Sequence, residues 1–220
     1  MGRKLGRRGF LKQSAAVAAG TGLAASFEEL ALLARAEAAT KDSKEAPPAG
    51  TAESFPKARI DVVEVSRLIC GGNLISGYAH SRDLIYVSDL LQHYFSDEKV
   101  FETFRLCEAH GINSAMLKLD QATLRILNEY WRKEGGSIQW ISQITNPNNL
   151  AEEVRQSLDN GAVGVFTTGQ MGDELVRKGR IDLIAKAVEQ IQDGGGIAGV
   201  SCHEIDVIIQ CEKAGIKPDF

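Results

Sequence analysis

The chain has 220 residues, of which 44% are hydrophobic and 25% are charged, and its formal net charge is −4. This composition is that of an ordinary globular protein and excludes a collagen-like, fibrous or fully disordered chain. No stretch approaches about 18 uninterrupted apolar residues, so we expect no stable membrane span in the mature protein. The acidic balance argues against a nucleic-acid partner, whereas a small-molecule ligand remains compatible with it.

The N-terminus has the layout of a signal peptide. Its first thirteen residues carry five basic groups and no acidic one, and a run of small residues follows. Arg7 and Arg8, with Phe10 and Leu11, resemble the twin-arginine export motif, which implies the twin-arginine translocation machinery as a partner. Cleavage within 34–39 would make residues 1–39 the signal and the mature protein periplasmic or extracellular. The alternative is an amphipathic basic helix that lies on a membrane or a partner.

The region after the signal divides into a linker and a domain. Residues 40–57 are polar, hold three of the five prolines and predict a disordered linker. From residue 58 onward, apolar runs alternate with helical patterns, so we expect one folded domain over 58–220.

Five segments of this domain have strand patterns. In the first segment, 58–73, we expect Ile60 and Val62 to face inward, with Val65 or Leu68 as further candidates. The other four segments are 112–119, 138–144, 162–168 and 197–202. Between them, apolar stripes predict helices that end before Gly135, Asn160 and Gly194.

Strands that alternate with helices predict a parallel sheet, because each crossover needs a helix to cover the sheet face. A dinucleotide-binding open sheet would begin with G-x-G-x-x-G, and Cys70-Gly71-Gly72-Asn73 lacks that spacing. The pattern therefore favours an α/β fold of the (β/α)8 TIM-barrel type. A full barrel takes about 250 residues. We therefore expect an incomplete, C-terminally truncated barrel with about five βα units and the start of a sixth strand at Pro218-Asp219-Phe220.

Three segments, in chain order, resemble aldo/keto reductases. Residues 58–73 are similar to the entry hairpin and first barrel strand of that family, residues 107–113 to the entry of its second strand, and residues 193–201 to a later strand. The resemblance implies an oxidoreductase that uses NADP on a small carbonyl or sugar-like substrate. It also places the NADP phosphate site beyond Phe220.

The catalytic pattern departs from this family. Its members follow G-I-N with an aspartate and a tyrosine, but Asn113 is followed here by Ser114-Ala115-Met116-Leu117-Lys118. The lysine and histidine of the family's tetrad have no counterparts in 138–143 and 166–170. Without a phenol acid, the usual proton donor for hydride transfer is missing. Three functions remain open: an oxidoreductase-like enzyme, a non-catalytic ligand-binding barrel, and a cofactor-free barrel isomerase or lyase.

Function in barrels of this type sits where the strands end. Lys118, on an otherwise apolar strand, is a candidate base or anion anchor, and a lysine that merely reaches solvent is the alternative. His203, at the end of the last strand, is a candidate general acid or base, with a capping or packed histidine as the alternative. These two residues would carry the isomerase or lyase chemistry. Substrate contacts are expected from Asn73, His80, Arg82, Asp83, Gln143 and Gln170.

A long insert, residues 77–96, follows the first strand, where a loop would cover the mouth of a barrel. Arg82 beside Asp83 is the best candidate there for binding a carboxylate or phosphate, because arginine presents a planar fork of donors. The alternative is a packed helix, predicted by the spacing of Leu84, Val87, Leu90 and Leu91. No metal is expected, since Cys202-His203 matches no zinc-binding spacing.

Overall fold

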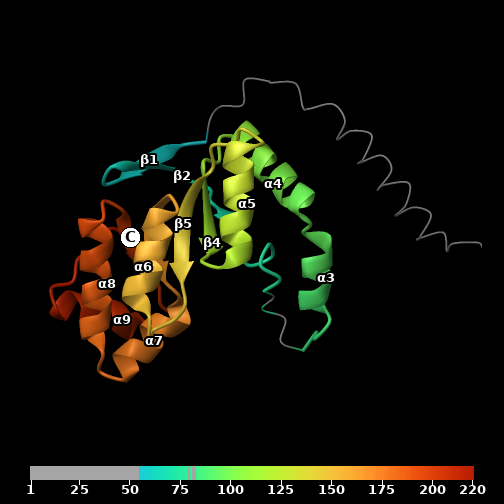
Figure 1. Ribbon diagram of the computed structural model, residues 1–220. Coiled ribbons are helices and arrows are strands. Elements are labelled where there is room, and N and C mark those ends of the chain that lie inside the picture. Colours follow the sequence, from blue (N-terminus) through green and yellow to red (C-terminus); the bar gives the residue numbers. More distant parts are fainter. Residues whose placement is uncertain (1–54, 79, 81–82) are drawn as a thin grey trace, which may run out of the picture. The chain divides into compact units, whose positions relative to one another are not determined.

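The computed structural model describes residues 55–78, 80 and 83–220, which all belong to one compact unit of the chain (Figure 1). The predicted signal peptide, most of the predicted linker and Arg82 lie outside the described residues. The described elements, in chain order, are β1 (Lys57–Ile60), β2 (Val63–Ser66), β3 (Cys70–Gly71), α3 (Val87–Tyr94), α4 (Asp97–Ala109), β4 (Ser114–Lys118), α5 (Gln121–Arg132), β5 (Gln139–Ile144), α6 (Leu150–Asp159), β6 (Ala162–Thr167), α7 (Gly169–Arg177), α8 (Ile181–Asp193), β7 (Ile197–Val200) and α9 (Ile205–Lys213).

The five later strands form one parallel sheet in the order β3-β4-β5-β6-β7. Each strand lies beside the next one in the chain, without the reversal of strand order that marks a doubly wound sheet. The α/β class, the parallel sheet and the last four predicted strand segments are therefore confirmed, with strand ends within two residues of those expected.

The helices form where the sequence supplies both a cap and an apolar stripe. Asp120 caps α5 by accepting a hydrogen bond from the Thr123 N–H at 2.8 Å, and Thr168 caps α7 by accepting one from the Met171 N–H. In α8, Ile184, Val188 and Ile191 are buried, as the predicted stripe requires. The three predicted helices are thus confirmed as α5, α6 and α8.

The main core lies between the sheet and its helices. In β4, Ala115 and Leu117 are buried against the helices, whereas Met116 and Lys118 belong to the opposite face, because successive side chains of a strand alternate. Trp140 of β5 is fully buried and donates its indole N–H to the Leu117 carbonyl at 3.0 Å. This alternation places every second residue of β4 on the face away from the helices.

Strands β1 and β2 form an antiparallel hairpin whose turn consists of two residues. Asp61 has φ 47°, and Val62 is 63% exposed at the tip. The prediction that Val62 faces inward is wrong for this reason, and Leu68, after the hairpin, is 48% exposed. Ile60 and Val65 do pack, together with Phe220, in a second, smaller apolar cluster.

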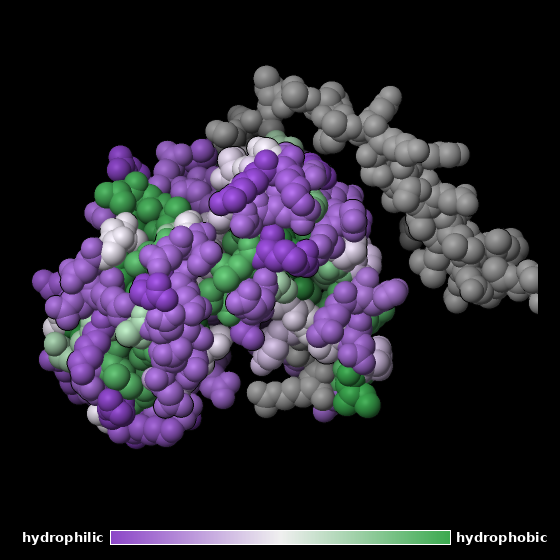
Figure 2. Space-filling model, in the orientation of Figure 1, coloured by the Kyte–Doolittle hydropathy of each residue, from purple (hydrophilic) through white to green (hydrophobic). Residues whose placement is uncertain are grey.

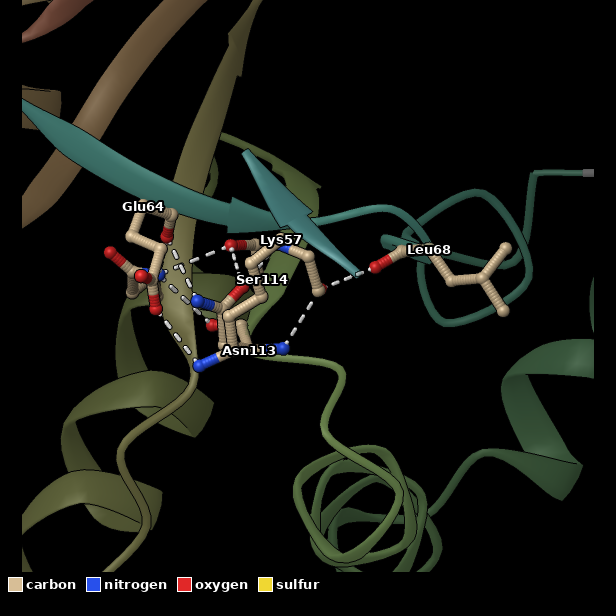
Figure 3. Close-up of polar contacts among 7 residues, drawn as sticks. Lys57, Glu64, Leu68, Asn113 and Ser114 are labelled. Carbon is tan, nitrogen blue, oxygen red and sulfur yellow. Dashed lines mark hydrogen bonds and ion pairs between the residues drawn. The ribbon is translucent and has the colours of Figure 1, made fainter. Parts of the chain in front are cut away.

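The hairpin is hydrogen-bonded to the amino ends of β4 and β5 (Figure 3). The Asn113 side chain accepts from the Ser66 N–H at 2.9 Å and donates to the Glu64 carbonyl at 2.8 Å. Gln139 donates to the same carbonyl at 2.9 Å, and the Lys57 ammonium pairs with the Glu64 carboxylate. This network closes the amino end of the sheet.

The last residues of the chain are hydrogen-bonded to β7. The Asp219 N–H donates to the Ala198 carbonyl at 2.7 Å, and the Phe220 carbonyl accepts from the Val200 N–H at 3.0 Å. These bonds place residues 219–220 beside β7, but residues 218–220 are not a strand of the described sheet, so the further strand stays a prediction.

The insert after β3 contains the helix of the alternative interpretation as α3, with Val87 and Leu91 half-buried and the other two named residues exposed. None of its residues is fully buried, and Leu84 and Leu90 are 45% and 57% exposed. Figure 2 shows a mostly hydrophilic face, with apolar surface over the tip of the hairpin and over the segment before α3. None of the helices described here is long and apolar enough to cross a membrane.

Candidate functional site

A pocket of about 520 Å³ lies at the carboxyl ends of the sheet strands. Parallel strands present their carboxyl ends at one edge, so the residues that follow different strands meet there although they are far apart in sequence. Six of the eight predicted site residues line this pocket: Asn73, His80, Lys118, Gln143, Gln170 and His203.

The other two predicted site residues are not placed in the pocket. Asp83 is exposed in a turn and is not among the residues that line it, and Arg82 lies outside the described residues. The predicted anion site at Arg82 and Asp83 is therefore without support from the part of the chain that the structure describes.

Register explains why two of the polar side chains share one wall. Lys118 of β4 is paired directly with Gln143 of β5 in the parallel ladder. Residues paired in this way point to the same face of a sheet. Both lie on the face opposite Leu117, which is buried in the helix-covered core. The wall of the pocket at β4 and β5 thus carries an ammonium group beside a carboxamide.

His203 on the far wall is held by a buried carboxylate. Its Nδ1 lies 2.7 Å from Oδ2 of Asp173 in α7, and its backbone N–H donates to Oδ1 at 3.0 Å. The Glu204 N–H also donates to Oδ1, at 3.1 Å. The Asp173 side chain is 5% exposed and that of His203 is 69% exposed. The pair therefore consists of a buried anchor and an imidazole that reaches the open pocket.

The electrostatics of Asp173 favour its charged form. Burial alone would raise the pKa of Asp173, but the hydrogen bonds from the His203 ring and from the N–H groups of His203 and Glu204 lower that pKa below its usual value. A carboxylate bonded to Nδ1 fixes the ring orientation and leaves Nε2 as the nitrogen that can exchange a proton.

Glycine at the start of α7 leaves room for this imidazole. A Cβ atom at Gly169 would lie 2.8 Å from Cε1 of His203, which is closer than real Cβ contacts. The position therefore tolerates no side chain while the His203 ring keeps its place against Asp173.

Asp173 is not among the residues predicted from the sequence, and no motif marks it. It lies 30 residues before His203, inside a helix that was not predicted. The spacing of the two residues does not predict their contact, because the folding of β6, α7, α8 and β7 brings them together. The only local sign is a carboxylate among residues that are buried, such as Met171 and Leu175.

The wall formed by the insert contributes a second imidazole. Nε2 of His80 lies 3.2 Å from the Asn73 side-chain amide, and its ring makes an edge contact with Tyr78 at 5.3 Å between ring centroids. His80 is therefore engaged by two neighbours, whereas Asp173 holds His203 through one ring nitrogen.

Among the described residues, no group of three or more histidine, cysteine, aspartate or glutamate side chains is arranged to hold a metal ion. For a nicotinamide cofactor, the described pocket offers polar side chains such as Asn73, Gln143 and Gln170. The phosphate site that the resemblance implies was expected beyond Phe220.

Comparison of the chain with protein-family models, with curated proteins and with solved structures found no match. The resemblance to aldo/keto reductases therefore rests on the sequence segments alone, and the geometry of the pocket carries the functional argument.

Proposed function

We propose that this protein is a barrel-type enzyme that moves a proton on a small carbonyl or sugar-like substrate, with His203 as the general acid and base. The observation that carries this proposal is the 2.7 Å contact between His203 Nδ1 and the buried Asp173 carboxylate. An imidazole oriented in this way, at the mouth of a pocket, is a common carrier of protons in enzymes.

The chemistry needs no cofactor. Nε2 of His203 accepts the proton from a hydroxyl-bearing carbon next to a carbonyl, and the electron pair of that C–H bond moves onto the carbonyl oxygen. The imidazolium returns the proton to the former carbonyl carbon while the hydroxyl proton moves to the former carbonyl oxygen, so a new carbonyl forms at the first carbon. The product is an isomer of the substrate, or an elimination product if a leaving group departs instead. The Lys118 ammonium is the group on the opposite wall that favours negative charge on the substrate.

The scaffold that supports this proposal is a partial (β/α)8 barrel. A parallel sheet wound in chain order, with a hairpin across its amino end, is consistent with such a barrel. Barrel enzymes place their chemistry at the carboxyl ends of the strands, where this pocket lies. The motif at Arg7 and Arg8 supports export, which would make this a periplasmic or extracellular enzyme.

A second candidate is an oxidoreductase that transfers a hydride from NADP to a small carbonyl compound. The hairpin ahead of the first parallel strand favours it, because the resemblance to aldo/keto reductases implies that feature. His203 would then protonate the oxygen of the reduced carbonyl. NADPH distinguishes this candidate from the first, since proton transfer within the substrate consumes no reductant.

The test is deuterium exchange catalysed by the full chain. Hydroxyacetone, dihydroxyacetone, glyceraldehyde and pyruvate are incubated in D₂O with the protein, and loss of the C–H signals is followed by ¹H NMR. We expect catalysed exchange for at least one compound, reduced about 10²- to 10⁴-fold by His203→Gln. His93→Gln, in the last turn of α3 and outside the pocket lining, is the matched control and should exchange as the parent does.

Three results point elsewhere. Equal exchange by the parent and His203→Gln would remove His203 from the mechanism. NADPH oxidation with a carbonyl compound, lost in His203→Gln, would favour the oxidoreductase. Thermal stabilisation by one of these compounds, without exchange or NADPH oxidation, would favour the non-catalytic ligand-binding barrel.

A further inference from the structure

We propose that Lys118 and Gln143 bind the carboxylate of the substrate, so that the pocket is specific for a small oxo acid or hydroxy acid. This inference rests on the proposed function for the reaction itself. It adds a substrate class to a pocket in which Lys118 forms no ion pair with any described residue.

Lys118 is the cation in question. It lines the pocket from the last position of β4, and the described residues provide it with neither an ion pair nor a side-chain hydrogen bond. Most other lysines of the domain that lie near acids are paired, as Lys178 is with Glu174. An ammonium group held in a pocket without a partner attracts an anionic ligand.

The two carboxylates that line the same pocket form no ion pair with Lys118, and each has another contact. Asp120 accepts a hydrogen bond from the Thr123 N–H and caps α5. Glu174 forms its ion pair with Lys178. The remaining polar partner on this wall is Gln143, which is in register with Lys118 and whose side-chain amide has no hydrogen bond within the described residues.

One ammonium and one carboxamide match a singly charged carboxylate. The ammonium supplies charge, and the amide N–H₂ supplies a second donor for the other oxygen. A phosphate ester carries close to two negative charges and would lie near Asp120 and Glu174 with only one lysine to offset it. The charge balance of the described wall therefore favours a carboxylate over a phosphate.

The position of His203 fits the same substrate. β4 and β7 are separated by two strands, which corresponds to roughly 14 Å along a sheet with a spacing of about 4.8 Å. The long stem of Lys118 and the imidazole of His203 both extend into the pocket from these strands. A substrate that reaches from Lys118 to His203 would be bound at one end and deprotonated at the other.

The test compares pyruvate with hydroxyacetone, two three-carbon ketones of which only pyruvate carries a carboxylate. Binding to the full chain is measured by isothermal titration calorimetry. We expect the parent to prefer pyruvate, and Lys118→Met to weaken pyruvate binding at least 10-fold while it changes hydroxyacetone binding less than 2-fold. Lys186→Met, exposed on α8, is the matched control and should leave both affinities unchanged.

Lys118→Gln provides a second variant, and circular dichroism of each variant verifies the fold. Equal pyruvate binding by the parent and both Lys118 variants would overturn the inference. Inorganic phosphate that displaces pyruvate at equal concentration would overturn the choice of a carboxylate.

Exchange measurements separate this inference from the proposed function. His203→Gln should bind pyruvate as the parent does but lose deuterium exchange. Pyruvate binding that depends on Lys118, without exchange by the parent, would support the carboxylate site and contradict the proton-transfer function. Equal exchange of hydroxyacetone and pyruvate by the parent would support the proton-transfer function and contradict the carboxylate site.

Discussion

Similar side chains at the two ends of the sheet differ in their hydrogen bonding. Gln139 and Gln143 lie on the same face of β5, four residues apart. Gln139, at the amino end, donates to the Glu64 carbonyl and lies within hydrogen-bond distance of Asn113 and Ser114. Gln143, at the carboxyl end, makes no side-chain hydrogen bond within the described residues and lines the pocket.

This difference predicts that substitutions at the two ends of the sheet affect different properties, stability at one end and ligand binding at the other. Polar groups at the amino end satisfy one another, so their removal should cost folding free energy. Lys118 and Gln143 at the carboxyl end have no side-chain partner within the described residues and are proposed to bind a ligand, so their removal should cost affinity or turnover and leave stability nearly unchanged. His203 joins the two cases, because a buried carboxylate holds a side chain that is itself open to the pocket.

The largest effect is expected at the amino end, from Asn113→Ala. The substitution leaves the Ser66 N–H and the Glu64 carbonyl without the partner that Asn113 provides. We expect a loss of about 2–4 kcal/mol in the free energy of unfolding, measured with urea. Asn128→Ala, on the exposed side of α5, is the control and should change it by less than about 0.5 kcal/mol. Similar stabilities of the two variants would contradict a structural role for the hairpin network.

The second effect concerns the anchor at the carboxyl end, Asp173→Asn. Three hydrogen bonds to a charged carboxylate are weakened, and we expect a loss of about 1.5–3 kcal/mol at pH 7. The pKa of Asp173 is lowered in the folded protein, so its charge stabilises the fold above the ordinary aspartate pKa of about 3.9. This contribution is lost as the pH falls through the lower folded value.

The difference in stability between the parent and Asp173→Asn should therefore shrink in acid. Urea unfolding at pH 7 and at a pH below about 3 measures it. An equal difference at both pH values would show that the Asp173 charge does not stabilise the fold.

The third effect is a gain in stability, from Thr167→Val. Thr167 closes β6 and is 1% exposed, and its hydroxyl has no hydrogen-bond partner within the described residues. Valine has nearly the same shape and removes that unsatisfied group, so we expect the free energy of unfolding to rise by about 1 kcal/mol. Thr123→Val, where the threonine is also buried, tests whether any such substitution stabilises. A lower stability of Thr167→Val would indicate that this hydroxyl has a partner after all.

Sequence patterns located most of this molecule for identifiable reasons. The strands after residue 111 were predictable because apolar runs of strand length alternate with helical stripes. Lys118, Gln143 and His203 were predictable as a group because parallel strands share one carboxyl edge. Neither pattern depends on distances between side chains.

What the sequence did not reveal depends on three-dimensional contacts. Asp173 meets His203 only across two helices and a strand. Val62 has the periodicity of an inward residue, but the two-residue turn at Asp61 puts it at the hairpin tip. The apolar residues of α3 have helical spacing, and spacing alone does not determine whether anything packs against that helix.

The smallest effect on stability is expected from Lys118→Met, and it is the most direct test of the comparison. Lys118 is exposed and has no partner within the described residues, so its removal should change the free energy of unfolding by no more than about 0.5 kcal/mol. Urea unfolding measures this, with Gln143→Ala as a second variant from the same wall. A loss of several kcal/mol in either would mean that these two side chains also stabilise the fold and are not reserved for a ligand.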